Sequence, residues 1–563
     1  REKYPEVFYY YDGLLDVAIS QSMHPAGIVA SPITLRDNYG TFISDGKEIL
    51  QIDMECVHEV SLVKYDILGL KNIEIIKDAY ELLGKPYPKS HEINWNDEAV
   101  WKDMLRSPIG IFQFEGEFAF QMLRQYEPHS IFDMSLVTAA LRPSGASYRD
   151  DLMQHKPHKN PSPIIDELLA DNNGYLIYQE DVIKFLQQIC GFSRRAIGRK
   201  DEERLKKALP QILEGYCEKS PQPREVAEQE AKEFLQIIQD ASSYMFGYNH
   251  SVGYCMIGYL CAYLRYYHPY EFITAYLNNA NGEEDVKNGN ELATLYGIRI
   301  VPPRFGLSKD KYLLNAEEKV IAKGISSVKY MNADVANELY ELAKAGKPKS
   351  FMDLLIQLDE KTHLDTRQRD ILVKIDYFAE YGNSKELLRM VDFFSFFKNG
   401  TMKKISKDKV TVELEPIIAQ YATDKSKSGQ PAKSYTFTDL PGLLRHLEVM
   451  VRDMHIQDFD LKSKMQIQLE NLGYIDLTTN KKEDQRKLVI LDIYPLRSKK
   501  TKEIWAYALQ VRSIGTGKTN RWTIYSELYD RKPLQRYDTI YVPMNGWGER
   551  RGYLYLYNYD YVI

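Results

Sequence analysis

Basic side chains are concentrated in one short segment of the sequence. From Arg194 to Lys207 there are seven lysines and arginines against three acids, Asp201, Glu202 and Glu203, a local excess of four positive charges. Phosphate groups are the usual ligands of such an excess, because each cation can neutralise a phosphate charge. The segment therefore suits a nucleoside triphosphate. A solvated helical face is the competing interpretation, and for an arbitrary chain it is the commoner one.

A cation and a carboxylate stand two residues apart, as Lys64 and Asp66, inside the largely apolar stretch of residues 61–68. This stretch predicts a β-strand, and side chains two apart on a strand point to the same face. Both groups would then face one ligand. Taken alone, an Asp in such a stretch is more often a helix cap or half of a structural ion pair than a catalytic group.

The composition excludes several classes of protein. The five cysteines form no C-x-x-C pair and no cluster with histidine, so neither a zinc site nor a disulfide framework is predicted. The apolar runs are too short for a membrane helix, and the first ten residues contain no signal-peptide segment. We therefore expect a soluble, non-secreted protein with reduced thiols. The net charge of -6 disfavours a uniformly basic nucleic-acid binder but leaves room for local basic patches.

A chain of 563 residues is long enough for roughly three to five domains. Strand-like and helical patterns mix over residues 1–100, and residues 101–285 are predicted to be mainly helical. A third unit of short helices, residues 286–398, contains a Pro-Pro break. Residues 399–485 form a predicted connector, whose Lys-, Ser- and Thr-rich first half is expected to be poorly packed.

Residues 486–563 have a different pattern, in which short β-type runs are separated by turns. Five such strands suit a small barrel such as an OB-fold. The predicted strands are 487–493, 504–511, 522–525, 539–542 and 553–557.

Four stretches are similar to the family C replicative DNA polymerases, and they follow that family's order across nearly the whole chain. This is the family of the bacterial DNA polymerase III alpha subunit, and the resemblance is to its C-terminal part. A weaker similarity, at residues 468–474, resembles the family's lead-in to its OB domain. The stretches are Met23-His24-Pro25-Ala26-Gly27-Ile28-Val29, Val63-Lys64-Tyr65-Asp66-Ile67-Leu68-Gly69-Leu70, Ala139-Ala140-Leu141-Arg142-Pro143-Ser144-Gly145 with Tyr178-Gln179-Glu180-Asp181-Val182, and Phe246-Gly247-Tyr248-Asn249-His250-Ser251.

The resemblance implies a multidomain α+β fold in a cytoplasmic protein, of a bacterium or of a cell infected by a bacteriophage. The implied parts are the C-terminal part of a nucleotidyltransferase-like palm at 1–100, mostly helical fingers at 101–285, a helix-hairpin-helix duplex-binding domain at 286–398, a connector at 399–485 and a C-terminal OB-fold β-barrel at 486–563.

The resemblance also implies catalytic residues. In the family, a Lys-x-Asp on a palm strand supplies one of three carboxylates that hold two Mg²⁺ ions, so Lys64 and Asp66 are implied to be catalytic and Asp66 to be a metal ligand. The family's Asp-x-Asp has no counterpart upstream of Lys64, where Asp12 and Asp16 are four apart and Asp53 stands alone. We expect the other Mg²⁺ ligands outside this chain, through a split gene, a cleaved product or a truncated sequence.

The fingers of the family close over the incoming nucleotide, and the run Arg-Arg-Ala-Ile-Gly-Arg-Lys resembles their basic motif. Two histidines near the similar stretches, His24 and His250, would have positioning roles at most. The residues implied to bind the nucleotide are Arg142, Tyr178, Arg194, Arg195, Arg199 and Lys200, with Tyr178 near the sugar and base.

Two further regions are implied to hold primer-template DNA. The helix-hairpin-helix domain would grip the duplex backbone through main-chain amides, with Asn332 left-handed where the family has glycine. The barrel would offer unpaired template a stacking platform, although core packing explains its aromatic residues equally well. The implied duplex contacts are Gly324, Ser326, Ser327 and Lys329, and the implied platform residues are Trp505, Arg512, Arg521 and Trp522.

The implied function is replication of DNA, by template-directed addition of deoxynucleoside triphosphates to a primer 3′ end. The implied partners are primer-template DNA, the nucleotides, a missing N-terminal palm segment or polypeptide, and a sliding clamp, whose binding motif is suggested only remotely by residues 435–440. The alternative is a non-catalytic DNA-binding module, or a subunit of a split polymerase. A metal ligand aimed at a nucleotide favours the enzyme, because a mere DNA binder has no use for one.

Overall fold

The chain divides into two units, residues 1–74 and residues 75–563. A computed structural model describes residues 3–15, 17, 23–24, 26–44, 46–191, 202–241, 245, 247–397, 404–425, 430–479, 481–498, 501–550 and 553–562. Within these residues no helix combines the length and apolarity that crossing a membrane requires.

The first unit contains two small antiparallel sheets. In one, β1 pairs with β4 so that Gly27 lies opposite Asp66 and Val29 opposite Lys64. The other is the β2–β3 hairpin. The mixed α/β prediction for this segment is therefore confirmed. Its elements are α1 (Pro5–Leu14), β1 (Gly27–Ala30), α2 (Leu35–Tyr39), β2 (Thr41–Ser44), β3 (Lys47–Leu50), α3 (Met54–Glu59) and β4 (Val63–Asp66).

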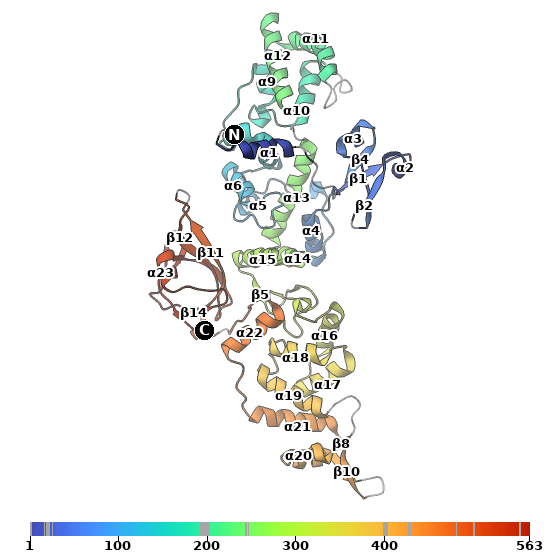
Figure 1. The fold of residues 1–563 in the computed structure, drawn as a ribbon, viewed down its shortest axis with the longest axis vertical. Helices are drawn as coiled ribbons and strands as arrows, with labels where there is room; N and C mark the ends of the chain where they lie inside the picture. Colours follow the sequence, from blue (N-terminus) through green and yellow to red (C-terminus); the bar gives the residue numbers. More distant parts are fainter. Residues whose placement is uncertain are drawn as a thin grey trace. The chain divides into compact units, whose positions relative to one another are not determined.

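The segment that follows is mainly helical, as predicted, and it is organised around the long helix α13, which packs against α5 and α7 (Figure 1). Fully buried Arg265 on α13 donates hydrogen bonds to the backbone carbonyls of Ser107 and Ile109. The helices are α4 (Lys71–Leu82), α5 (Glu98–Met104), α6 (Glu117–Tyr126), α7 (Ile131–Ala140), α8 (Arg149–Met153), α9 (Pro163–Leu168), α10 (Gln179–Lys184), α11 (Glu202–Lys219), α12 (Arg224–Ala241), α13 (Tyr248–Tyr267), α14 (Pro269–Asn278) and α15 (Glu283–Leu295).

A three-stranded sheet of order β5-β7-β6 leads into a second helical region with a core of its own. Residues 404–425 and 430–437 contribute to this core and include the sheet β8-β10-β9, so the described part of the stretch predicted to be poorly packed is folded. Its composition is polar, but Ile405, Ile418 and Tyr435 are buried in this core, and Val410, Leu414 and Phe437 pack against it. The elements are β5 (Arg299–Val301), β6 (Leu313–Asn315), β7 (Val320–Ala322), η5 (Ile325–Ser327), α16 (Ala333–Ala345), α17 (Phe351–Lys361), α18 (Thr366–Lys374), α19 (Ser384–Phe397), β8 (Lys404–Ser406), α20 (Glu415–Tyr421), β9 (Ala422–Lys425), β10 (Pro431–Phe437), α21 (Leu440–Asp453) and α22 (Leu461–Leu472).

The C-terminal part is one curled sheet of order β15-β16-β13-β12-β11-β14-β17 (Figure 1). All five predicted strands are present, and two short ones were missed. Strands β13 and β16 run parallel, whereas β14 pairs antiparallel with both β11 and β17. The elements are β11 (Lys487–Arg497), β12 (Ile504–Ser513), β13 (Thr519–Tyr525), α23 (Ser526–Arg531), β14 (Thr539–Tyr541), β15 (Trp547–Arg550), β16 (Tyr553–Leu556) and β17 (Asp560–Tyr561).

Candidate functional site

Lys64 and Asp66 lie on one face of β4, as the alternation of a strand requires. The Lys64 Nζ is 2.7 Å from the Asp66 Oδ1, and the Lys64 side chain is 12% exposed against 51% for Asp66. Gly27 lies opposite on β1, where a Cβ atom would come within 3.0 Å of both the Lys64 Cε and the His24 Nδ1. Glycine at this position therefore lets His24 and Lys64 lie beside each other next to the carboxylate.

The electrostatics of this cluster keep Asp66 ionised. A hydrogen bond from Lys64 lowers the pKa of Asp66, and the nearby His24 and His58 add to the effect, while partial desolvation opposes it. An ionised, half-exposed carboxylate is the form that binds a hard divalent cation. The sequence had singled out His24 with little weight, and it missed His58, which lies on α3.

A complete metal centre is absent from the described part of the chain, where no group of three or more His, Cys, Asp or Glu side chains could hold an ion. One carboxylate does not hold two Mg²⁺ ions, so the described residues do not fit the two-metal centre that the resemblance implies. Asp66 can be one ligand of such a centre and no more.

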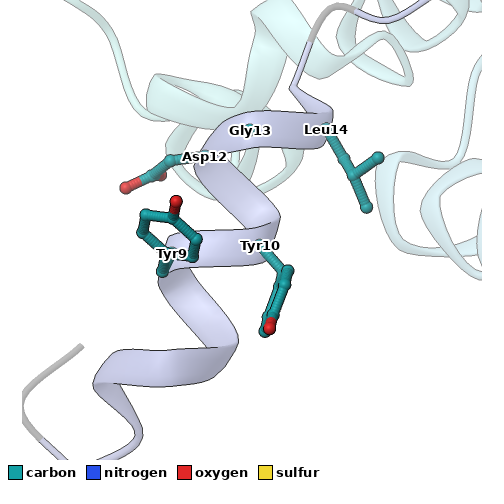
Figure 2. Close-up of a pocket in the computed structure, with 5 residues that line it drawn as sticks. All are labelled: Tyr9, Tyr10, Asp12, Gly13 and Leu14. Atoms are coloured by element: carbon teal, nitrogen blue, oxygen red, sulfur yellow. The ribbon is translucent and has the colours of Figure 1, made fainter.

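A surface pocket in the first unit is lined by five residues of α1, drawn in Figure 2. It includes neither Lys64 nor Asp66. The side chains of Tyr9, Tyr10 and Leu14 are exposed, so the pocket has no enclosed interior. Asp12 is its only ionisable group besides the tyrosines. We assign it no chemistry.

Arg142 and His250 share a surface in the second unit. Arg142 is exposed just before η2 (Pro143–Ser147), and His250 is exposed in the first turn of α13. Burial and the charge of Arg142 lower the pKa of His250. The His250 ring lies 4.1 Å from that of Tyr254, which in turn contacts Phe112 at 5.2 Å. The charge of Arg142 thus acts on an imidazole that contacts a pair of aromatic rings.

The other implied nucleotide ligands are placed differently. Tyr178 is buried in the core, where its hydroxyl lies 2.7 Å from the Ser135 Oγ and desolvation raises its pKa strongly. A side chain in this position packs between α7 and α13. Four of the implied ligands lie outside the described residues: Arg194, Arg195, Arg199 and Lys200.

The pKa of His250 provides a test of the shared surface. Replacing Arg142 with Gln removes a positive charge that disfavours the imidazolium, so we expect the pKa of His250 to rise toward that of an ordinary histidine. NMR titration of histidine-labelled chain, with His250→Gln to assign the resonance, measures this shift. An unchanged pKa would show that the two side chains do not interact.

The implied duplex contacts lie around η5. A Cβ atom on Gly324 would come 2.2 Å from the Asp310 carbonyl oxygen, so close backbone packing explains this glycine. The side chains of Ser326, Ser327 and Lys329 are exposed. The left-handed residue of the hairpin is not Asn332, as expected, but Tyr330, whose φ is 67°. Asn332 instead has a φ of -131° and caps α16 by accepting a hydrogen bond from the Val335 amide.

The implied platform residues are split between the interior and the exterior of the curled sheet. Trp522 is 8% exposed and belongs to the core. The Arg512 guanidinium is 2.6 Å from a carboxylate oxygen of buried Asp476, so it is committed to an internal ion pair. Trp505, 44% exposed, and Arg521 remain on the surface. Trp522 therefore packs in the core, as the competing interpretation predicts.

Trp505 belongs to a row of aromatic rings on the exterior, of which the sequence reasoning missed Tyr555 and Tyr557. Tyr525 is 6.1 Å from Trp505 and stacks on Tyr555 at 5.6 Å, and Tyr555 stacks on Tyr557 at 6.4 Å. The Arg550 guanidinium lies 5.8 Å from the Tyr557 ring. The alternation of Tyr and Leu from residue 553 to 557 is visible in the sequence and predicts that Tyr555 and Tyr557 share a face, because alternate residues of a strand do so.

Comparison with known proteins gives matches over both units. The model of the bacterial DNA polymerase III alpha subunit NTPase domain matches residues 1–69, and that of the finger domain matches residues 72–220. The chain resembles the DNA polymerase III alpha subunit. The boundary between the two matches falls close to the boundary between the two structural units.

Individual alpha subunits match more of the chain. That of Borreliella burgdorferi is 28% identical over 449 residues, which are 76% of this chain and 38% of the relative. That of Ureaplasma parvum is 24% identical over 553 residues, 94% of this chain and 52% of the relative. The family recognised from the sequence is confirmed, and the chain spans between about a third and a half of the length of these relatives.

Proposed function

We propose that this chain is part of a replicative DNA polymerase that adds deoxynucleoside triphosphates to a primer 3′ end in the cytoplasm. The observation that carries the proposal is the Lys64–Asp66 pair, a cation and an ionised carboxylate on one strand face. It lies within the residues that match the polymerase NTPase domain. A neutralising cation beside a metal-binding carboxylate is what phosphoryl transfer requires.

The domain assignments follow from the same proposal. Residues 1–100 belong to the palm, 101–285 to the fingers, 286–398 to a helix-hairpin-helix domain and 486–563 to an OB-fold. Support for the OB-fold comes from the topology, in which β11, β12 and β13 form a meander and β13 pairs in parallel with β16. In place of a loose connector, described residues from 404 to 472 pack onto the third domain. Ile475 and Leu477 pack with Val489 of β11.

In the proposed reaction Asp66 is one ligand of a two-ion Mg²⁺ centre, and the remaining carboxylates come from a polypeptide that carries the family's Asp-x-Asp strand. Asp66 would be this chain's ligand to such a centre, which would supply activation of the primer hydroxyl and stabilisation of the leaving pyrophosphate. The residues of this chain hold the components in place: Lys64 keeps Asp66 ionised, and Arg142 offers positive charge to the triphosphate. Ser326, Ser327 and Lys329 contact duplex DNA.

Single-stranded template is assigned to the exterior of the OB-fold. Its platform is the aromatic row Trp505, Tyr525, Tyr555 and Tyr557, with Arg521 and Arg550 contacting phosphates. A sliding clamp remains a proposed partner without an assigned motif. Segment 435–440 is remotely similar to a clamp-binding motif. Its Tyr435 side chain is buried in β10 and donates a hydrogen bond to Glu415, so this segment is not available to bind a clamp as a linear peptide.

Primer extension with and without the complementing polypeptide tests the proposed function. We expect the 563-residue chain alone to bind primer-template DNA but to extend it at background level, because the described residues contribute one carboxylate to a centre that needs several. Addition of a polypeptide with the Asp-x-Asp strand should restore Mg²⁺-dependent extension. Strong extension by the chain alone would refute the assignment of the missing ligands, and binding without restored extension would favour a non-catalytic module.

A further inference from the structure

In the hairpin between η5 and α16, Tyr330 has a backbone conformation that is unfavourable for a residue with a side chain. Tyr330 has a φ of 67°, in the left-handed region where glycine is the usual occupant. Its side chain is 54% exposed, so core packing does not explain the choice of tyrosine. A strained, exposed aromatic residue persists where the surrounding structure over-determines it, and such positions concentrate at binding sites.

Two neighbouring residues of α18 hold Tyr330 in this conformation. Gln368 is buried and donates a hydrogen bond of 2.7 Å from its side chain to the Tyr330 carbonyl. Asp365 fixes Gln368 in turn through a capping box at the start of α18. The Arg367 guanidinium carbon lies 3.4 Å from the centroid of the Tyr330 ring, a close cation–π stack.

Several amides around this hairpin donate hydrogen bonds inside the protein. Lys329 donates its amide to the Asn471 carbonyl at 3.0 Å, Met331 donates to Val328, and Ser326 donates to Asp310. These groups cannot also donate to a DNA phosphate, although amide contacts were expected from the resemblance. Exposed side chains with a positive charge are also present here, and these are Lys329 and Arg367.

We propose that Tyr330 and Arg367 form a side-chain contact to the phosphate backbone of duplex primer-template DNA. The inference rests on the proposed DNA-binding function. Stacking on Tyr330 fixes the plane of the guanidinium and leaves its edge for a charge-assisted, bidentate bond to a phosphate. The side chain of Arg367 is exposed, and among the described residues its recorded contact is the Tyr330 ring. The need to position Arg367 with an aromatic ring accounts for a tyrosine at the left-handed position.

Duplex binding by the full chain, measured by fluorescence anisotropy over a range of salt concentrations, tests the contact. We expect Arg367→Gln to weaken duplex binding about tenfold and to reduce the salt dependence by roughly one phosphate equivalent. Arg367→Lys should recover part of the affinity, because the charge returns without the planar stack. The matched control is Arg389→Gln. This substitution removes the same charge from another arginine beside an aromatic ring, since Arg389 lies 4.7 Å from the Phe393 ring on α19. The duplex affinity of the Arg389→Gln variant should change less than twofold.

Tyr330→Gly separates binding from stability. Glycine adopts a φ of 67° without strain, so we expect the thermal stability to be kept or raised while duplex affinity falls several-fold. The double variant should bind no more weakly than Arg367→Gln, because the two side chains act as one unit. If wild-type chain binds duplex and Tyr330→Gly or Arg367→Gln binds equally well, the inference is wrong and the proposed function stands. A wild-type chain that binds no duplex overturns both.

Discussion

Asp66→Asn is expected to reduce primer extension by the complemented enzyme by roughly a thousandfold or more, while primer-template affinity stays nearly unchanged. The substitution preserves the shape of a half-exposed side chain but removes the charge that would bind a metal ion. Loss of several kcal/mol of transition-state stabilisation corresponds to a rate effect of about this size. Affinity is kept because contacts to phosphates elsewhere dominate DNA binding. Single-turnover extension and anisotropy on the same preparation measure the two quantities.

Glu48→Gln provides the matched control for Asp66→Asn. Glu48 is an exposed carboxylate of the same unit, on the separate β2–β3 hairpin, where it pairs with Arg36 at 2.7 Å. Extension by this variant should remain close to that of the wild type. A large loss of affinity in Asp66→Asn, accompanied by residual extension, would contradict its assignment as a metal ligand and indicate a DNA contact.

Trp522→Ala is expected to cost about 3 to 5 kcal/mol in stability of the curled sheet, because it leaves a cavity among Leu509, Val511 and Ile524. Trp505→Ala should cost far less, since Trp505 is 44% exposed. Hydrogen exchange of the full chain localises the effect, with protection lost over β11, β12 and β13 in the first variant alone.

Binding of single-stranded DNA should show the opposite ranking. Removal of one stacking ring costs roughly 1 to 3 kcal/mol, so Trp505→Ala and Tyr557→Ala should each weaken single-strand binding by about tenfold with little effect on duplex. Tyr557→Phe should retain single-strand binding, because the aromatic ring is kept. Equal single-strand binding by Tyr557→Ala and wild type would exclude the aromatic row as the platform, and normal protection in Trp522→Ala would exclude its role in the core.

Local patterns in the sequence were sufficient for much of this protein. The motifs around Lys64, Arg142 and His250 identified the family. The two-residue spacing of Lys64 and Asp66 placed them on one face, because the period of a strand is a local property. The five strands of residues 486–563 followed from alternating apolar residues and turns. Each of these inferences depends on neighbours within a few positions along the chain.

Partners distant in the sequence decided the rest. Alternation gives a strand two faces but does not say which one is covered, so only the packed sheet placed Trp522 inside and Tyr525 outside. Arg512 was predicted to contact DNA, yet the ion pair with Asp476, 36 residues away, gives its charge an internal partner. The left-handed conformation of Tyr330 is stabilised by Gln368 of α18, which donates a hydrogen bond to the Tyr330 carbonyl. Burial and long-range hydrogen bonds arise only when elements pack, and no local pattern encodes them.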